Sequence, residues 1–516
     1  MNKNSEKKSI LLIHPPISKP CEPPAGLAKL ACALLAAGID CRVYDANIEG
    51  ILSLLENPAK NDDTWSKRAI GGIQDNLKSL RTRALYSKID RYKRAVMDIN
   101  RVLHISGQKA GVNISLSNYT SFDLPPVRSI GLMQAAERFY ENPFYDHFQK
   151  RLTVLFYDQE PDIIGFSVNF MSQALCAFAM AGFIRKKFVE TRIVFGGGLI
   201  SSWKAIPGFG NPFSGLVDDL VAGPGEAVLL SMCGKNSVSE SKFTGYAYTR
   251  FPLDQYLAPG LIIPYSTSRG CYWQKCKFCP EKFEQSGYQP MNIGAVMEDI
   301  HRLVRQTNPY LIHFLDNALP PRFLTRLIQN PPGVPWYGFT RITHHLADPD
   351  FVKGLKAAGC VMLKLGIESG DQGVLDSLEK GIDLNTVSKS LWTLKAAGIS
   401  TYGYLLFGTP AETQASAKKT LRFTIAHAQA INFLNLAVFN LPAFSEDAKT
   451  LETSEFYHGD LSLYREFAHP AGWNRDRVRR FLAKEFKHHP AIRPILNNAP
   501  PFFTSNHAPL LMISEK

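Results

Sequence analysis

Three cysteines with close spacing carry the clearest chemistry in this sequence. Cys271, Cys276 and Cys279 form a Cys-x4-Cys-x2-Cys pattern directly after the apolar run 261–268. Three thiolates this close together can hold zinc or an iron-sulfur cluster. A structural zinc site needs four ligands, and no Cys or His follows Cys279 before His301. A cubane [4Fe-4S] cluster held by three thiolates leaves one iron open to a substrate or cofactor, and we favour this interpretation.

Six other cysteines are scattered along the chain, several within apolar runs that read as helices or strands. Nine cysteines in 516 residues are odd in number and too sparse for a disulfide scaffold. We therefore interpret the scattered ones as small buried hydrophobic residues.

The elements around the cysteine loop indicate a barrel. Six strand-like runs alternate with helical segments, which predicts a partial (β/α)6 TIM-like barrel over residues 262–445. The cysteine loop follows the first of these strands, at the edge where barrel enzymes carry their active sites. The six runs are 261–268, 310–316, 336–342, 361–369, 399–408 and 431–441.

The cysteine loop and barrel together resemble the radical S-adenosylmethionine superfamily, although the spacing is one residue longer than the usual Cys-x3-Cys-x2-Cys. Phe278 matches the aromatic that this family places near the adenine. The resemblance implies that Glu368 and Ser369 contact the ribose and methionine parts of S-adenosylmethionine, in the segment GIESG. It also implies that Asp316 and Arg341 face the cofactor from neighbouring strand ends.

The segment LLFGTPAET resembles the fifth-strand segment of the same family, which implies that Gly408 and Pro410 shape the adenine pocket. Taken singly, Glu368 or Asp316 could only cap a helix, and Arg341 could pair with a structural carboxylate. Their order along the chain favours the functional interpretation.

An α/β pattern also precedes the barrel. Strand-like and helical runs alternate over residues 1–235, interrupted at about 51–150 by polar, basic helical stretches. This predicts a doubly wound, Rossmann-like domain with a helical insertion. Residues 236–261 are polar and turn-rich and are predicted to be a linker, and 446–516 form a small C-terminal extension.

The N-terminal pattern resembles the cobalamin-binding domain that precedes the barrel in one large radical subclass. Ser167 and the glycines Gly196, Gly197 and Gly198 end two strands on one edge, where the backbone can approach a nucleotide-like tail. Gly225 and Glu226 lie in a segment, GPGEAVL, that resembles the GEGE turn of this subclass. A plain nucleotide-binding Rossmann domain is the alternative, but no G-x-G-x-x-G follows the first strand.

The Asp-x-His-x-x-Gly motif of cobalamin carriers is missing from this chain. His14 ends the first strand near the corresponding loop, so it is a candidate lower ligand of cobalt. A histidine before Pro-Pro at a strand end is more often a hydrogen-bonded loop residue, and the subclass commonly leaves this face of cobalt without a protein ligand.

Charge and hydropathy restrict the class of protein. The net charge is +12, and the segment 67–109 alone holds eleven Lys or Arg against three Asp. No nucleic-acid-binding motif accompanies this segment or the basic patch at 475–487, so we expect solvated helix faces or an anionic substrate or partner.

No run approaches 18 apolar residues, so we expect a cytoplasmic protein without a membrane span or secretory signal.

The resemblance implies a cobalamin-dependent radical S-adenosylmethionine enzyme, most simply a C-methyltransferase. One S-adenosylmethionine would methylate cobalamin, and a second would give a 5'-deoxyadenosyl radical that abstracts hydrogen from an unactivated carbon. A non-methylating rearrangement, oxidation or ring formation is the alternative, and a cluster-based sensor or electron-transfer module is a further one. A small-molecule, lipid or peptide substrate and a flavodoxin- or ferredoxin-type electron donor are the expected partners, with no nucleic acid.

Overall fold

The computed structural model describes residues 8–235, 245–282, 284, 287–501 and 507–512. The chain divides into two compact units, each built on one parallel sheet. Of the described residues, the first unit comprises those up to 261 with 458–462 and Pro501, and the second comprises the rest. The described part of the predicted linker, 245–261, belongs to the first unit, where Tyr256 donates a hydrogen bond to Asp45 at 2.6 Å, and 236–244 lie outside the described residues.

The first unit contains a five-stranded sheet in the order β2-β1-β5-β6-β7, and all its neighbouring strands run parallel. Every residue of the apolar strands β1 and β5 is buried, as expected for central strands that are covered on both faces. The strands are β1 (Ser9–Ile13), β2 (Asp40–Tyr44), β5 (Ile163–Ser167), β6 (Arg192–Gly196) and β7 (Asp219–Leu220).

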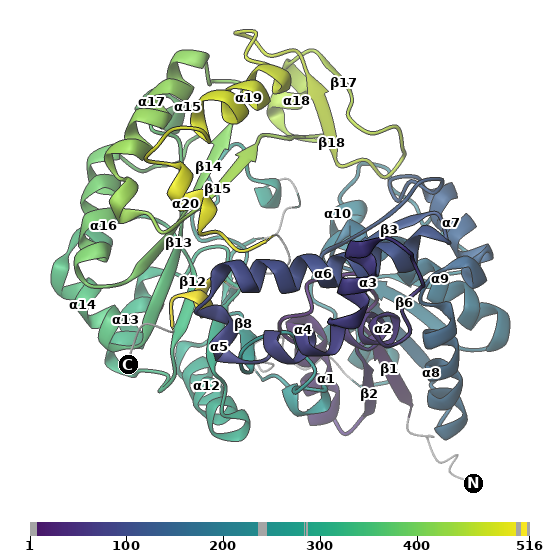
Figure 1. Ribbon diagram of the computed structural model, residues 1–516. Helices are drawn as coiled ribbons and strands as arrows, with labels where there is room; N and C mark the ends of the chain where they lie inside the picture. Colours follow the sequence, from purple (N-terminus) through teal and green to yellow (C-terminus); the bar gives the residue numbers. More distant parts are fainter. Residues whose placement is uncertain (1–7, 236–244, 283, 285–286, 502–506, 513–516) are drawn as a thin grey trace. The chain divides into compact units, whose positions relative to one another are not determined.

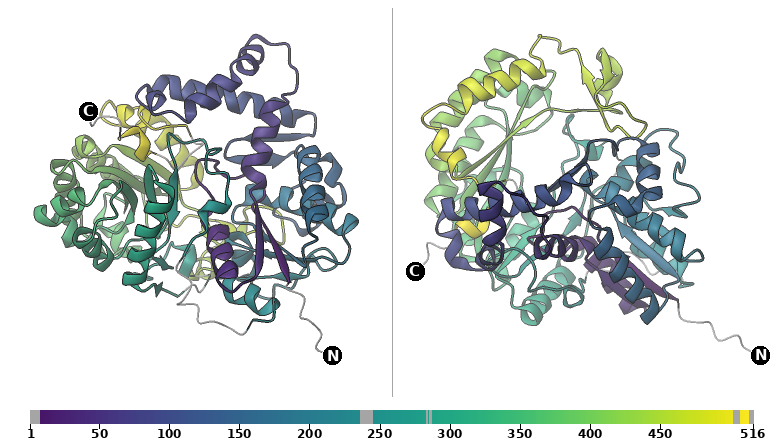
Figure 2. Two further views of the ribbon diagram at one scale, coloured as in Figure 1. Left: turned by 90° about the horizontal axis from the view of Figure 1, so that it is seen from below. Right: turned by 45° about the vertical axis from the view of Figure 1, so that its right-hand side comes forward.

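Helices cover both faces of this sheet, as the doubly wound prediction requires. Helices α1 and α11 pack against each other, as do α8 and α9, whose blue ribbons can be followed in Figure 2. The order of the strands places these two pairs on opposite faces when each crossover is right-handed. The bounds are α1 (Ala25–Ala36), α8 (Tyr145–Asp158), α9 (Met171–Lys187), α10 (Gly198–Lys204) and α11 (Glu226–Met232).

The insertion between β2 and β5 is mostly helical, as expected, but it also contains an antiparallel hairpin that the sequence analysis did not predict. Its long helix α6 is amphipathic, and the apolar side of α6 contacts α3, α4 and the hairpin. The elements are α2 (Ala46–Glu56), α3 (Thr64–Gly71), α4 (Ile73–Leu80), α5 (Arg83–Tyr86), α6 (Ile89–Gln108), β3 (Val112–Ser115), β4 (Asn118–Ser121) and α7 (Ser129–Glu137).

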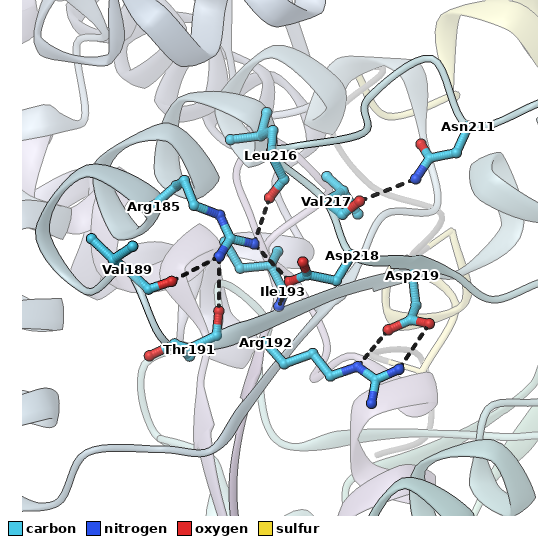
Figure 3. A network of polar contacts seen from close by, with 10 residues as sticks. All are labelled: Arg185, Val189, Thr191, Arg192, Ile193, Asn211, Leu216, Val217, Asp218 and Asp219. Atoms are coloured by element: carbon cyan, nitrogen blue, oxygen red, sulfur yellow. Dashed lines mark hydrogen bonds and ion pairs between the residues drawn. The ribbon is translucent and has the colours of Figure 1, made fainter.

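The short edge strand β7 is held by side chains as well as by its ladder (Figure 3). Arg185, at the end of α9, donates to the carbonyls of Val189, Thr191 and Leu216 and to the Asp218 carboxylate at 2.6 Å. The same carboxylate accepts the backbone N–H of Ile193 in β6. One guanidinium therefore fastens α9 and the start of β6 to the segment that leads into β7.

The second unit contains six parallel strands in the order β15-β14-β13-β12-β11-β8. Each strand pairs with the next strand of this sheet along the chain, and the sheet curves as an open barrel with its helices outside (Figure 1). The predicted partial barrel is confirmed. The strands are β8 (Ile262–Tyr265), β11 (Leu311–Phe314), β12 (Trp336–Thr340), β13 (Cys360–Glu368), β14 (Ser400–Phe407) and β15 (Phe433–Val438).

Of the six outer helices α12–α17, five begin after a residue whose side chain caps them, and α13 instead begins with a proline. Asn292, Asp348, Asp371, Asp383 and Thr413 each accept a backbone N–H of the helix that follows. The helices are α12 (Ile293–Thr307), α13 (Pro321–Gln329), α14 (Pro349–Ala357), α15 (Gln372–Ser377), α16 (Leu384–Ala396) and α17 (Gln414–Ala426).

The C-terminal extension adds a small antiparallel sheet and short helices to the second unit. Its elements are α18 (Glu446–Thr450), β17 (Thr453–Glu455), β18 (Tyr464–Phe467), α19 (Arg475–Phe481) and α20 (Arg493–Asn497), and β16 (Leu441–Pro442), just before the extension, pairs with β18. Within the described ranges, no helix combines the length and the apolar character that crossing a membrane requires.

Candidate active site

The cysteine loop is closed at its base by two short antiparallel strands, β9 (Ser268–Arg269) and β10 (Gln289–Pro290). The Met291 N–H also donates to the Thr267 carbonyl at 3.1 Å. The loop therefore starts and ends directly above β8, at the carboxyl edge of the barrel.

Cys271, Cys276 and Cys279 line one cavity of about 210 Å³, together with Gln274, Glu281, Lys282 and Gly287. Burial raises the pKa of the Cys276 thiol, and it raises that of Cys279 to about 11. Metal binding therefore has to displace protons from these two thiols. No three His, Cys, Asp or Glu side chains of the described residues lie close enough together to hold a metal ion.

This arrangement fits a cubane cluster. The three sulfur donors surround a cavity at a strand end, and thiolates are the usual ligands of iron-sulfur clusters. Such a cluster spreads its protein ligands over several irons, so the thiols need not converge on one point.

The loop is docked on the turn 378–381, which follows α15. The Trp273 ring fills the space beside Gly381, where an added Cβ would come within 2.0 Å of the ring. Its indole N–H donates to the Glu379 carbonyl at 3.0 Å, and the Lys277 N–H donates to the Leu378 carbonyl at 3.1 Å. The turn thus positions the peptide that carries the cysteines.

Arg341, just after β12, is buried beneath this loop. Its guanidinium lies 4.1 Å from the centre of the Trp273 ring, and Nη1 lies 3.9 Å from the Cys276 sulfur. A second nitrogen donates to the Lys380 carbonyl. The predicted cofactor-facing arginine therefore contacts a cysteine of the cavity directly.

Glu368 ends β13 with a left-handed backbone, φ +63°, at a register shift against β14. Its carboxylate accepts a hydrogen bond from the Lys380 ammonium at 2.7 Å, and both side chains are buried. The Lys380 ammonium lies 5.5 Å from the centre of the Phe278 ring. Glu368, Lys380 and Phe278 thus lie together, next to Arg341 and Cys276.

Asp316 and Ser369 also lie at strand ends, but each is engaged within the protein. Asp316 accepts hydrogen bonds from the Thr267 N–H, the Thr267 hydroxyl and the Ser268 hydroxyl at 2.6–2.9 Å. Burial raises the pKa of Asp316. Ser369 lies 3.1 Å from the Thr420 hydroxyl and accepts the Asp371 N–H. In this structure both side chains order the loops at the barrel edge.

Gly408 follows β14 with φ +79°, and Pro410 lies half-buried in the turn after it. The Gly408 N–H donates to Glu412, which is completely buried and also accepts the Trp473 indole N–H at 2.9 Å. Burial raises the pKa of Glu412 to about 7. Gly408 and Trp473 line a cavity of about 160 Å³ whose other walls are both apolar (Phe439, Phe467) and polar (Glu466, His469, Arg475). The volume is sufficient for a small planar ring, since a cavity of about 150 Å³ accommodates benzene.

In the first unit, His14 and Ser167 lie at the carboxyl ends of the neighbouring strands β1 and β5. The chain continues from β1 to β2 on one side and from β5 to β6 on the other. Such a switch point is where doubly wound sheets bind ligands. His14 is buried there, with Nε2 2.8 Å from the Ser18 hydroxyl and Nδ1 3.4 Å from Gln173. Burial lowers the pKa of His14. Both ring nitrogens thus have protein partners, which favours the loop-residue interpretation over a cobalt ligand.

Asn169 connects the other residues of this edge. Its amide donates to the Ser167 hydroxyl at 3.1 Å, and its carbonyl oxygen accepts the Gly198 N–H at 3.0 Å. Gly197 has φ +103°, and a Cβ there would lie 2.6 Å from the Val168 carbonyl. A Cβ on Gly196 or Gly198 would meet nothing closer than 3.6 Å. Of these three glycines, only Gly197 lies where the surrounding protein leaves no room for a side chain.

Gly225 and Glu226 pack against α1. A Cβ on Gly225 would lie 3.2 Å from Leu30, and the buried Glu226 lies 3.7 Å from the Lys29 ammonium. The GPGEAVL turn thus fixes the start of α11 to α1.

No family model matches this chain. An uncharacterized methyltransferase of Pyrococcus horikoshii is 26% identical over 187 residues, 34% of this chain and 40% of that protein. The anaerobic magnesium-protoporphyrin IX monomethyl ester cyclase of Rubrivivax gelatinosus is 26% identical over 34% of this chain and 32% of its own length. The match therefore spans less than half of either relative.

Among solved structures, the radical S-adenosylmethionine methyltransferase TsrM from Kitasatospora setae, with cobalamin and a [4Fe-4S] cluster bound, matches 85% of this chain and 73% of its own. Its TM-score is 0.50 at 14% identity. The cobalamin-dependent radical enzyme OxsB, with aqua-cobalamin bound, matches 86% of this chain and 54% of its own, with a TM-score of 0.53 at 13% identity. This chain has the fold of the cobalamin-dependent radical S-adenosylmethionine enzymes. The predicted fold class is confirmed.

Three residues of the candidate site were missed by the sequence analysis: Trp273, Lys380 and Glu412. Trp273 lies inside the Cys-x4-Cys spacing, and Glu412 lies in the segment LLFGTPAET, so both could have been found from the motifs that carry the resemblance. Lys380 lies twelve residues after Glu368, and only the turn after α15 brings the two side chains together.

Proposed function

We propose that this chain is a cobalamin-dependent radical S-adenosylmethionine enzyme, and more specifically a C-methyltransferase that acts on an unactivated carbon. The observation that carries the proposal is the cavity lined by Cys271, Cys276 and Cys279 at the carboxyl edge of an open six-stranded barrel. The fold shared with TsrM and OxsB supports it, as does the similarity to a methyltransferase.

Different residues are suited to hold the cluster, S-adenosylmethionine and cobalamin. The three cysteines would hold a [4Fe-4S] cluster, and the buried Glu368 carboxylate would accept hydrogen bonds from hydroxyl or ammonium groups of S-adenosylmethionine. The cavity beside Gly408 has a suitable volume for the adenine ring. The edge formed by Ser167 and Gly198 would hold cobalamin.

When bound, the cluster and S-adenosylmethionine supply a 5'-deoxyadenosyl radical, and cobalamin supplies the methyl group. The chain's own residues bind and orient these groups and exclude water. Arg341 places a cation beside the thiol-lined cavity, where it compensates the negative charge of bound thiolates, whereas the nearby Lys380 cation is paired with Glu368. Trp273 holds the cysteine loop on the barrel, so the cavity remains at the strand edge.

The cluster is tested by anaerobic reconstitution of the full chain. The wild type should bind about four irons and four sulfides and, when supplied with a one-electron reductant, cleave S-adenosylmethionine to 5'-deoxyadenosine and methionine. Cys276→Ala should lose the brown chromophore and the cleavage, whereas Cys233→Ala, in the first unit, should retain both. Full cleavage by the Cys276 variant would contradict the proposal.

Methyl transfer is tested first without the substrate. Reduced cobalamin and methyl-labelled S-adenosylmethionine should give one S-adenosylhomocysteine per enzyme and place the label on cobalamin. With substrate, each methylated product should account for one S-adenosylhomocysteine and one 5'-deoxyadenosine. 5'-Deoxyadenosine without matching S-adenosylhomocysteine would instead indicate a rearrangement, oxidation or ring formation, such as the activity named for the cyclase relative.

A further inference from the structure

The cysteine loop contains one residue more than the usual spacing of its superfamily, and the structure shows where the longer loop leads. Between Cys271 and Cys276, Gln274 adopts a left-handed backbone, φ +53°, and Trp273 turns onto the barrel. Gly381, with φ +65°, leaves room for the indole ring. The longer loop thus exposes Gln274 and Lys275 and directs the Trp273 ring onto the barrel, against Gly381.

Arg341 is held between this ring and a cysteine sulfur. One face of its guanidinium lies 4.1 Å from the centre of the Trp273 ring, a cation–π arrangement. Nη1 lies 3.9 Å from the Cys276 sulfur, and another nitrogen is fixed by the Lys380 carbonyl. Only 6% of Arg341 is exposed, so water screens its charge weakly.

We propose that Arg341, positioned by Trp273, donates a hydrogen bond to the Cys276 thiolate and raises the reduction potential of the cluster bound there. Hydrogen bonds to cluster sulfurs and nearby charges tune such potentials, and a buried cation stabilises the more negative, reduced state. This inference rests on the proposed function, because it assumes the [4Fe-4S] cluster. It assigns Arg341 to the cluster rather than to S-adenosylmethionine.

The experiment measures the midpoint potential of the cluster in the reconstituted full chain by a redox titration monitored by electron paramagnetic resonance. Arg341→Gln removes the charge, and Lys275→Gln is its matched control. Lys275 also lies over the Trp273 ring, at 5.0 Å, and neighbours Cys276, but it is exposed and screened by water. Trp273→Leu removes the ring and keeps Arg341.

Arg341→Gln should lower the equilibrium constant for one-electron reduction by about tenfold, a potential about 59 mV more negative. Trp273→Leu should shift it in the same direction by less, because the guanidinium is then less fixed. Lys275→Gln should leave it unchanged. A potential in Arg341→Gln that equals the control or is more positive would overturn the inference.

If Arg341→Gln does not retain iron, Arg341→Lys decides the question, since it keeps the charge. A cluster with a potential near that of the wild type supports the role of the charge, and loss of iron here as well would make Arg341 a scaffold residue and overturn the inference. These outcomes differ from failure of the proposed function, in which the wild type itself would neither bind the cluster nor cleave S-adenosylmethionine.

Discussion

The Lys380 ammonium lies 2.7 Å from the Glu368 carboxylate, and both side chains are about nine-tenths buried. A Cβ on Gly366, on the same strand, would come within 2.6 Å of both charged groups. Gly366 therefore leaves the space that the buried ion pair occupies. Because a buried charge without a partner is costly, each residue of this pair depends on the other.

Lys380→Met is expected to leave the Glu368 carboxylate buried without its cation. The second unit should lose about 3–5 kcal/mol of unfolding free energy, and affinity for S-adenosylmethionine should fall. Lys419→Met is the matched control, because Lys419 pairs with Asp371 at 3.0 Å while half exposed and should cost about 1 kcal/mol or less. Urea unfolding and equilibrium binding measure the two effects, and equal losses in both variants would contradict the importance of burial.

The double variant Lys380→Met with Glu368→Leu separates stability from binding. Replacing both charges by apolar groups should restore most of the stability, since neither charge remains buried alone. Binding of S-adenosylmethionine should remain weak if Glu368 contacts it. Recovery of binding in the double variant would remove Glu368 from the cofactor site.

At the edge of the first unit, Gly198 is the informative position for cobalamin. Gly198→Val meets no protein atom closely at its Cβ and should leave the fold intact, but it should weaken cobalamin binding by about tenfold or more if the tail passes this edge. Gly197→Ala should instead disturb the loop itself, because its Cβ would meet the Val168 carbonyl at 2.6 Å. Titration with hydroxocobalamin measures the affinity, and circular dichroism measures any disturbance of the fold. Unchanged affinity in Gly198→Val would place the cobalamin tail elsewhere.

The buried Glu412 carboxyl should make stability depend on pH. Its pKa is raised by burial from the ordinary 4.5 to about 7, so the folded chain holds a proton that the unfolded chain releases. Stability therefore falls as pH rises from 4.5 to 7, by about 3 kcal/mol from this group. Glu412→Gln should remove that part of the dependence, whereas Glu298→Gln, at an exposed position of α12, should not. Urea unfolding at about pH 5 and about pH 8 provides the comparison, and an identical pH dependence in Glu412→Gln and wild type would contradict the shift.

Arg185 is expected to contribute more to the stability of the first unit than Arg192 does. Arg185 donates to three backbone carbonyls and a carboxylate, so Arg185→Ala should cost about 2–3 kcal/mol by leaving acceptors near β7 without a donor. Arg192 makes one half-exposed ion pair with Asp219, and Arg192→Ala should cost about 1 kcal/mol or less. Limited proteolysis of the first unit would show the difference, and iron binding should remain unchanged in both variants.

The alternation of apolar runs with helical segments predicted both sheets, because parallel strands need a crossover helix between each pair and are buried by those helices. The hairpin formed by β3 and β4 was not predicted, since its eight strand residues include few apolar ones and lie between long helical stretches. The sequence also could not show that residues 245–261 pack on the first unit, because that packing depends on single contacts such as Tyr256 with Asp45.

The cysteine spacing, its place after the first barrel strand and the order of the polar strand ends can be read from the sequence, because these are properties of neighbours along the chain. Which side chains meet depends on the fold. In the folded chain, Asp316 and Ser369 form hydrogen bonds with loop residues. Glu368 pairs with Lys380, and Arg341 contacts Cys276. These pairings join residues 12 to 65 positions apart, and such contacts are set by the closure of loops on a shared core.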